Sequence, residues 1–476
     1  MGLTFAMLDD STQSLLRILK WLVLSTIVGL IVGVLDAGFL KLLDVAMGAR
    51  NTVPCFYVGL PFALYFVALL SRKVAKTHKD YSTDAVIKRI NAYQPVTLRS
   101  AVKTFVLSIV TMTVGGSAGK EAPCADVGAG ISAFVARLLR MSPQDQRKMM
   151  ICGVSAGFAG VFGVPVSGAL FGLEVLWVGH LFYEVMFPAL VAGITAFGVT
   201  SYLGVNYLYH PLAFVPVFSE QFFLKVIVAG IFFGLISLLF IEINKLARVV
   251  LRYITTHSSM FMTCMVAGLV LVLMGHFLSP LYLGLGMEGI DGPLSGMAPQ
   301  SPLGFLYKMV TTSITLAAGG IGGLITPIFF VGAQAGAMLS DFLRVDSATL
   351  AALGLVCVLS GTANTPLAAS IMAIELFGAP IAPYATVACV ISFLLTGRQS
   401  IFPHQRISLD NGKTNETLAY HGPNRRASDR GQLPSHLLVT TQMRHRIKRF
   451  WPNRTTRQGV IAQGRKRMQD VYDKKK

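Results

Sequence analysis

GGSAGKEAPCADVGAG, residues 115–130, is the stretch on which the rest of this chain depends. It ends an uncharged run, residues 104–119, and so places Lys120 and Glu121 at membrane depth, where ionisable groups are costly and usually functional. Pro123 suits the first turn of a helix, because its missing N–H is not needed there. Glycines before it let backbone amides approach a ligand, and a helix N-terminus offers free N–H donors and partial positive charge. The stretch therefore predicts an anion site at which the Glu121 carboxylate competes with a bound anion.

The composition indicates a polytopic membrane protein built from helices. Of the 476 residues, 53% are hydrophobic and only 13% are charged. Backbone polar groups must be satisfied inside lipid, which predicts helices, whereas a β-barrel would show short alternating segments. The segments are often broken by glycine or proline, which is typical of proteins that build a polar site in the middle of the membrane. Uncharged runs cover residues 52–71, 149–173, 185–219, 258–287, 309–340, 347–374 and 376–397.

The N-terminal region predicts a membrane helix that stays in the mature protein. Residues 1–14 form a short polar lead, and the first helix is expected over residues 15–45. No small-residue cleavage site follows this apolar run, so it is not interpreted as a signal peptide. Further along, Ser82 or Thr83 can cap a short helix within a basic stretch.

The net charge of +18 is distributed unevenly. From Pro403 onward there are 17 Lys and Arg against 5 Asp and Glu, which leaves +12 in this segment. The positive-inside rule places the basic segments and both termini on the cytoplasmic side of a plasma membrane, or of the inner membrane in a Gram-negative bacterium. Residues 280–303 contain no basic residue and are expected to face outward. The other basic clusters are residues 72–103, 137–148 and 245–252.

The C-terminal segment, residues 406–476, is expected to be a basic and largely disordered cytoplasmic tail, because it has few apolar runs. It lacks a recognisable nucleic-acid-binding module, and juxtamembrane basic clusters more often bind anionic lipid. We therefore expect lipid partners and no nucleic acid. The six cysteines show no CxxC spacing and suit small apolar positions, and the histidines show no metal-ligand spacing. No metal or cofactor is expected.

Two halves of the chain share a spaced motif, which indicates an internal repeat over about residues 15–203 and 222–402. G-x-x-x-P followed by VGA occurs at residues 119–129 and again at residues 323–333. Corresponding broken segments in two halves point to the binding site of a transporter, where both halves aim helix N-termini at one point that favours a small anion. A proline nine residues before a glutamate also recurs, as Pro165 with Glu174 and Pro366 with Glu375.

These motifs resemble those of the ClC family of chloride channels and proton/chloride exchangers, over about residues 15–405. GKEAP at residues 119–123 is similar to the family's GKEGP or GREGP element, and GGLITP at residues 322–327 to its GxFxP element. GVPVSGALFGLEVL at residues 163–176 and GTANTPLAASIMAIELF at residues 361–377 are also typical. The resemblance implies an all-α inverted repeat of about eighteen tilted helices, assembled as a homodimer with one pore per subunit. The tail is too short and polar for the nucleotide-binding CBS domain pair of other members.

The resemblance also implies the roles of individual residues. Glu121 is expected to be the gating glutamate, whose carboxylate occupies an anion position until it is protonated or displaced. Phe402 stands where the family has a pore tyrosine, and Ser82 lies where a serine-bearing GSGIP element is expected. The implied anion site comprises Gly119, Lys120, Ala122, Gly323, Leu324, Ile325, Thr326, Phe402 and Ser82.

The expected function is a chloride or small-anion channel gated by Glu121. The inner proton-transfer glutamate of the exchangers would follow directly after Glu174, and Val175 occupies that position. A proton/anion antiporter that uses Glu174 as a proton relay is the alternative, although Glu174 and Glu375 also suit a symmetric structural role. A carrier for an organic substrate and a membrane-embedded enzyme are remoter alternatives. No HExxH motif or convincing catalytic pair supports an enzyme, and the preferred anion stays open.

Overall fold

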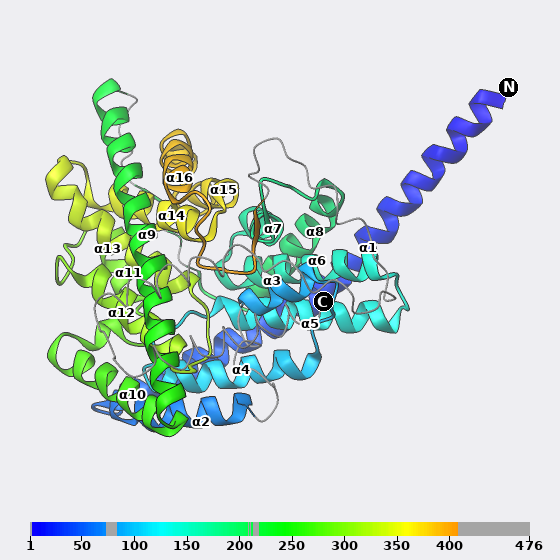
Figure 1. Cartoon of the computed structure of the whole chain (residues 1–476). Helices are drawn as coiled ribbons and strands as arrows, with labels where there is room; N and C mark the ends of the chain where they lie inside the picture. The colour runs from blue at the N-terminus through cyan, green and yellow to red at the C-terminus, as the bar shows by residue number, and fades with distance from the viewer. Residues whose placement is uncertain (1, 73–82, 208, 210, 213–218, 408–476) are drawn as a thin grey trace, which may run out of the picture. The chain divides into compact units, whose positions relative to one another are not determined.

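The computed structural model describes residues 2–72, 83–207, 209, 211–212 and 219–407. Ser82 and residues 408–476 of the expected tail lie outside the described residues. The described chain is almost entirely helical, which confirms the all-α polytopic fold class (Figure 1). Six of its helices are long and apolar enough to cross a membrane, so the chain is a multi-pass membrane protein.

The helices divide between the two halves that the repeated motifs predict. The first half contains α1 (Gly2–Asn51), α2 (Leu60–Arg72), α3 (Thr83–Asn91), α4 (Leu98–Thr113), α5 (Glu121–Leu138), α6 (Pro143–Phe162), α7 (Pro165–Glu174) and α8 (Tyr183–Tyr202). The second half contains α9 (Glu220–His257), α10 (Met260–Phe277), α11 (Glu288–Leu294), α12 (Gly304–Ala317), α13 (Ile325–Leu343), α14 (Ser347–Ala363), α15 (Pro366–Phe377) and α16 (Ala382–Thr396). Three short 3-10 turns, Phe56–Gly59, Pro280–Tyr282 and Ala379–Ile381, and one parallel pair of two-residue strands, β1 (Trp177–Val178) and β2 (Arg406–Ile407), complete the described chain.

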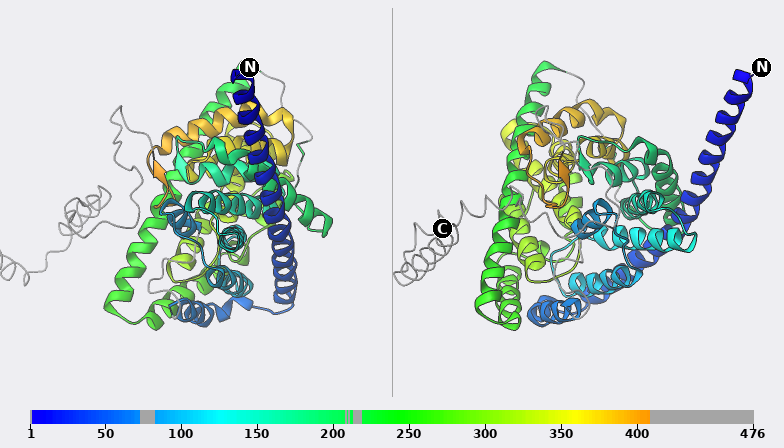
Figure 2. Two further views of the ribbon diagram at one scale, coloured as in Figure 1. Left: turned by 90° about the vertical axis from the view of Figure 1, so that its right-hand side faces the viewer. Right: turned by 45° about the vertical axis from the view of Figure 1, so that its right-hand side comes forward.

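The two halves lie side by side, with α5–α8 on one side and α9–α14 on the other (Figures 1 and 2). The helix α2 is an exception, because it packs against α10 of the second half. The first helix is longer than the sequence predicts, since α1 begins at Gly2 and not near Leu15. Residues 3–14 contain no glycine or proline and several alanine, leucine and methionine residues, which favour helix.

The same close helix contact occurs in both halves. The helix α5 packs on α6, and α13 packs on α14. A Cβ atom at Gly128 would overlap the carbonyl oxygen of Gly153, and one at Gly332 would overlap the carbonyl oxygen of Gly354. Small residues of this kind let membrane helices approach until their backbones touch. The VGA element of each half therefore fixes the spacing of a helix pair.

The halves also cap each other's helices. Glu174, at the end of α7, accepts two hydrogen bonds from free amides at the start of α15. Glu375, at the end of α15, accepts the corresponding two from the start of α7. A carboxylate at a helix N-terminus satisfies amides that have no partner within the helix. The donors are Leu367 N at 3.1 Å, Ala368 N at 2.9 Å, Val166 N at 2.9 Å and Ser167 N at 2.9 Å.

The glycine contact between α5 and α6 predicts a specific loss of stability. Gly128→Ala inserts a methyl group against the Gly153 carbonyl, which should cost about 1–3 kcal/mol of unfolding free energy by overpacking. Thermal unfolding in detergent measures the change. Gly38→Ala on α1 is the matched control, because no atom lies within 4 Å of the added carbon. It should leave the midpoint unchanged or raise it slightly, and an equal loss in both variants would contradict the packing argument.

Candidate functional site

The two glycine-rich loops that precede α5 and α13 are joined directly to each other. Gly119 N donates to Gly323 O at 2.8 Å, and Gly323 N donates to Gly119 O at 2.7 Å. The two residues occupy equivalent positions in the repeated motif. This antiparallel bridge therefore brings the N-termini of α5 and α13 to one point, as the repeat predicts.

Threonines of the neighbouring helices hold the loops in place. Ser117 N donates to Thr315 Oγ1 of α12 at 3.1 Å. Ile321 N donates to Thr111 Oγ1 of α4 at 3.2 Å. Each loop is thus bonded to the helix that leads into the other loop. Because all four residues are buried, these bonds satisfy amides that lipid cannot.

Glu121 is the first residue of α5, but its carboxylate lies at the N-terminus of α13. Its Oε1 accepts a hydrogen bond of 2.5 Å from Ile325 N. Its Oε2 accepts bonds of 3.0 Å from Thr326 Oγ1 and 3.4 Å from Thr326 N. The side chain is 1% exposed. A buried carboxylate thus occupies the free amides of the opposite half, where the helix end favours negative charge.

The Glu121 carboxylate fits in this position because both residues that adjoin it, Gly119 and Gly323, are glycines. A Cβ atom at Gly119 or at Gly323 would overlap the carboxylate of Glu121. The two glycines that form the bridge therefore also make the space for the acidic group. Glycine in a strand-like segment often marks such a close approach.

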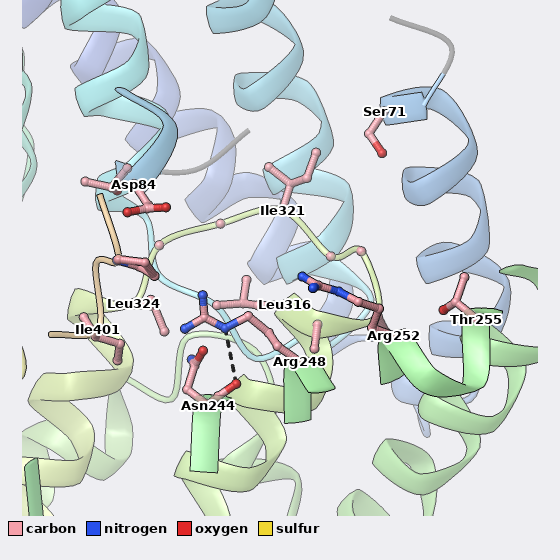
Figure 3. A pocket seen from close by; sticks show the side chains of 18 of the residues that line it. Ser71, Asp84, Asn244, Arg248, Arg252, Thr255, Leu316, Ile321, Leu324 and Ile401 are labelled. Atoms are coloured by element: carbon pink, nitrogen blue, oxygen red, sulfur yellow. Dashed lines mark hydrogen bonds between the residues drawn. The ribbon is translucent and has the colours of Figure 1, made fainter. Parts of the chain in front are cut away.

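Two cavities adjoin the residues around this carboxylate. One, the Lys120 cavity, has a volume of about 360 Å³ and is lined by Lys120 and Thr326 among others. The second, the Phe402 cavity, has a volume of about 530 Å³ and its lining includes Gly323, Leu324 and Phe402 (Figure 3). The Glu121 carboxylate is bonded to Thr326 of the first lining and lies against Gly323 of the second.

The structure brings together most of the residues expected at the anion site. Gly119, Gly323, Ile325 and Thr326 surround the Glu121 carboxylate. Ala122 is buried in the first turn of α5, Lys120 lines one cavity, and Leu324 and Phe402 line the other. Glu174 lines neither cavity and is bonded to α15. Ser82 lies outside the described residues.

The sequence did not indicate the polar lining of the Phe402 cavity. Asp84 of α3 accepts a hydrogen bond of 2.9 Å from His404 N, and His404 Nδ1 lies 2.6 Å from the Asp84 carboxylate. Arg248 and Arg252 of α9 also line this cavity. Their spacing of four residues places both on one helix face. This spacing is the feature of the sequence from which a shared basic surface could have been predicted. Among the described residues no cluster of His, Cys, Asp and Glu could hold a metal ion.

Comparisons with known proteins match most of the chain. The sequence model of the family described as voltage gated chloride channel matches residues 63–397. A chloride/fluoride channel protein of Pseudomonas syringae pv. tomato is 35% identical over 396 residues, which cover 82% of this chain and 87% of that protein. The crystal structure of a CLC-type fluoride/proton antiporter shares 25% identity with a TM-score of 0.77, covering 82% of this chain and 98% of that one. A slow cyanobacterial Cl⁻/H⁺ antiporter has a similar fold, with 18% identity and a TM-score of 0.71, over 80% of this chain and 96% of that one.

The carboxylate geometry predicts what happens when its charge is removed. Glu121→Gln keeps nearly the same volume but no longer competes with an anion for the α13 amides. Chloride or fluoride binding, measured by titration calorimetry in detergent, should tighten about tenfold or more, which corresponds to ~1.4 kcal/mol. Glu288→Gln removes an exposed carboxylate on α11 that has no bond to these amides, and it should change binding little. Equal affinities for wild type and Glu121→Gln would contradict the competition.

Proposed function

The chain belongs to the voltage gated chloride channel family, and from this premise we propose that it is a proton-coupled antiporter that exchanges a small halide, fluoride or chloride, for protons. Its relatives are ion channels or transporters, and small-anion transport across a membrane is the function that they share. One observation carries the proposal. The Glu121 carboxylate is bonded to the amide donors of α13 and lies against one residue from the lining of each of two cavities.

The bonding of Glu121 provides the link between anion and proton. A halide that enters from either cavity competes with the carboxylate for Ile325 N, Thr326 N and the Thr326 hydroxyl. A displaced carboxylate would have to leave these donors as a charge in an apolar environment, which is costly unless it takes up a proton. Anion binding and proton uptake at Glu121 are therefore coupled, and each favours the other.

The comparisons favour the antiporter over the channel that the sequence led us to expect. Val175 suggested a channel because it cannot carry a proton, and Phe402 because it lacks a hydroxyl that could help to close the anion site from the inside. A relative of similar fold at 25% identity is a fluoride/proton antiporter, and this relation supports the antiporter. Fluoride is included among the substrates because the relatives named above are a chloride/fluoride channel and a fluoride/proton antiporter.

The orientation of the protein follows from its charge. Arg248 and Arg252 line the Phe402 cavity and belong to the basic cluster at residues 245–252. Residues 280–303, which contain no basic residue, include Asp291 of the Lys120 cavity. The positive-inside rule supports a cytoplasmic Phe402 cavity and an outward Lys120 cavity.

A homodimer is the proposed assembly. Large apolar side chains are exposed on α8, α15 and α16, within residues 163–203 and 366–396, and we propose that these helices form the interface. Each of these helices also carries alanine, which suits close packing between helices. The exposed side chains are Phe187, Ile194, Leu367, Val390 and Leu394.

Proton movement in purified liposomes tests the antiporter. A halide gradient directed out of the vesicles should drive protons inward against a proton gradient, and the reversal potential should shift with pH. A pH electrode and a halide electrode give the stoichiometry. Glu121→Gln should still pass halide but should no longer move protons. Halide flux with no proton movement in the wild type would establish the channel instead.

The two capping glutamates provide a matched test of the inner proton route. Glu174→Gln and Glu375→Gln each place an amide group against backbone N–H donors in equivalent positions of the two halves. If both are structural, both variants should lose stability by about 1–3 kcal/mol and keep the same proton-to-halide ratio. A ratio that falls only in Glu174→Gln would make Glu174 the proton relay. Thermal unfolding and the liposome assay together separate these outcomes.

A further inference from the structure

The Phe402 cavity contains two arginines that have no part in the Glu121 site. Arg248 and Arg252 lie one turn apart on α9, and Figure 3 shows both guanidinium groups directed into the cavity. Arg248 Nε donates to the backbone oxygen of Asn244 at 3.3 Å, which anchors one edge of its guanidinium. The remaining N–H groups of both arginines have no hydrogen-bond partner among the described residues.

Within the described part of the chain, neither of the two positive charges is neutralised by an ion pair. Asp84 is the single carboxylate among the described residues that line this cavity. Its two oxygens are bonded to His404, through the backbone N at 2.9 Å and near Nδ1 at 2.6 Å. No carboxylate of the described residues lies within salt-bridge distance of Arg248 or Arg252.

The cavity connects these arginines with the loop that holds the carboxylate. Its lining includes residues 319–324, the glycine-rich loop before α13. Gly323 of this loop directly adjoins the Glu121 carboxylate. An anion that enters the cavity past Arg252 and Arg248 therefore arrives at the N-terminus of α13.

We propose that Arg248 and Arg252 form a collecting site for small inorganic anions, which raises the halide concentration at the cytoplasmic mouth of the transport path. The inference rests on the proposed anion transport and adds the residues that supply the anion. A cleft with low-dielectric walls and charges of one sign focuses the field and increases the local concentration of counter-ions. Arginine suits this role, because it is charged at every physiological pH and is only weakly hydrated. Its position in a water-accessible cavity keeps binding weak, as transit requires.

The test measures halide dependence of transport in liposomes that contain full-length protein in one orientation. Arg248→Gln and Arg252→Gln should each raise the half-saturating chloride or fluoride concentration about tenfold when halide is varied on the cavity side. The deficit should shrink as halide rises, and Arg248→Lys and Arg252→Lys should restore most of the affinity. In the wild type, an impermeant salt should raise the half-saturating concentration by screening the two charges.

Arg99→Gln is the matched control. Arg99 is exposed at the start of α4, belongs to another basic cluster and does not line the cavity. A shift in Arg99→Gln equal to that in Arg248→Gln would reduce the effect to surface charge and overturn the proposal. An unchanged half-saturating concentration in both cavity variants would also overturn it. If the variants fail to fold, a half-saturating concentration of the wild type that does not rise with impermeant salt overturns the proposal instead. Proton movement in the same vesicles reports separately on the antiporter.

Discussion

The pair of hydrogen bonds between Gly119 and Gly323 is the constraint on which the rest of this structure depends. It fixes two loops, one from each half, so that the N-termini of α5 and α13 meet in the interior of the protein. Amides at these helix ends have no intrahelical partner, and lipid offers none. A hydrogen-bond acceptor within the protein has to satisfy them, and the helix ends favour one with negative charge. In the described structure this acceptor is the Glu121 carboxylate.

The two halves carry the same repeated motif but differ at the position of Glu121. In the aligned motifs Glu121 corresponds to Ile325, and Ala122 corresponds to Thr326. One half therefore supplies the acid, and the other supplies two amides and a hydroxyl. With a second acid in place of Ile325, two carboxylates would repel each other at one point. The bonding of Glu121 to the opposite half therefore depends on a difference between the two motifs. Glu174 and Glu375 occupy equivalent positions in the two halves, and each satisfies the amides at a helix N-terminus of the other half.

The two cavities differ in charge. The Phe402 cavity is lined by Arg248, Arg252 and Asp84, and among the described residues neither arginine has an ion-pair partner, whereas the Lys120 cavity is lined by Lys120 and Asp291. The Phe402 cavity is therefore the more positive of the two, and Glu121 lies against a residue of each lining.

The sequence alone determined the membrane class, the helical architecture and the two glycine-rich loops before α5 and α13, because each depends on local pattern. A helix that crosses lipid needs a long uncharged run, so these runs reveal the membrane helices. The glycines together with Pro123 and Pro327 mark the two loops without any knowledge of the tertiary structure. Other features depend on pairings between distant segments that leave no periodic signal. The tertiary structure alone decided that Glu121 bonds to the opposite helix, that Glu174 and Glu375 cap each other's helices, and that Asp84 meets His404 across 320 positions of sequence. It also showed that Arg248 and Arg252 of the basic cluster at residues 245–252 line a cavity, whereas the sequence indicated only on which side of the membrane the cluster lies. Helix periodicity places the two arginines on one face, but it does not show what that face contacts.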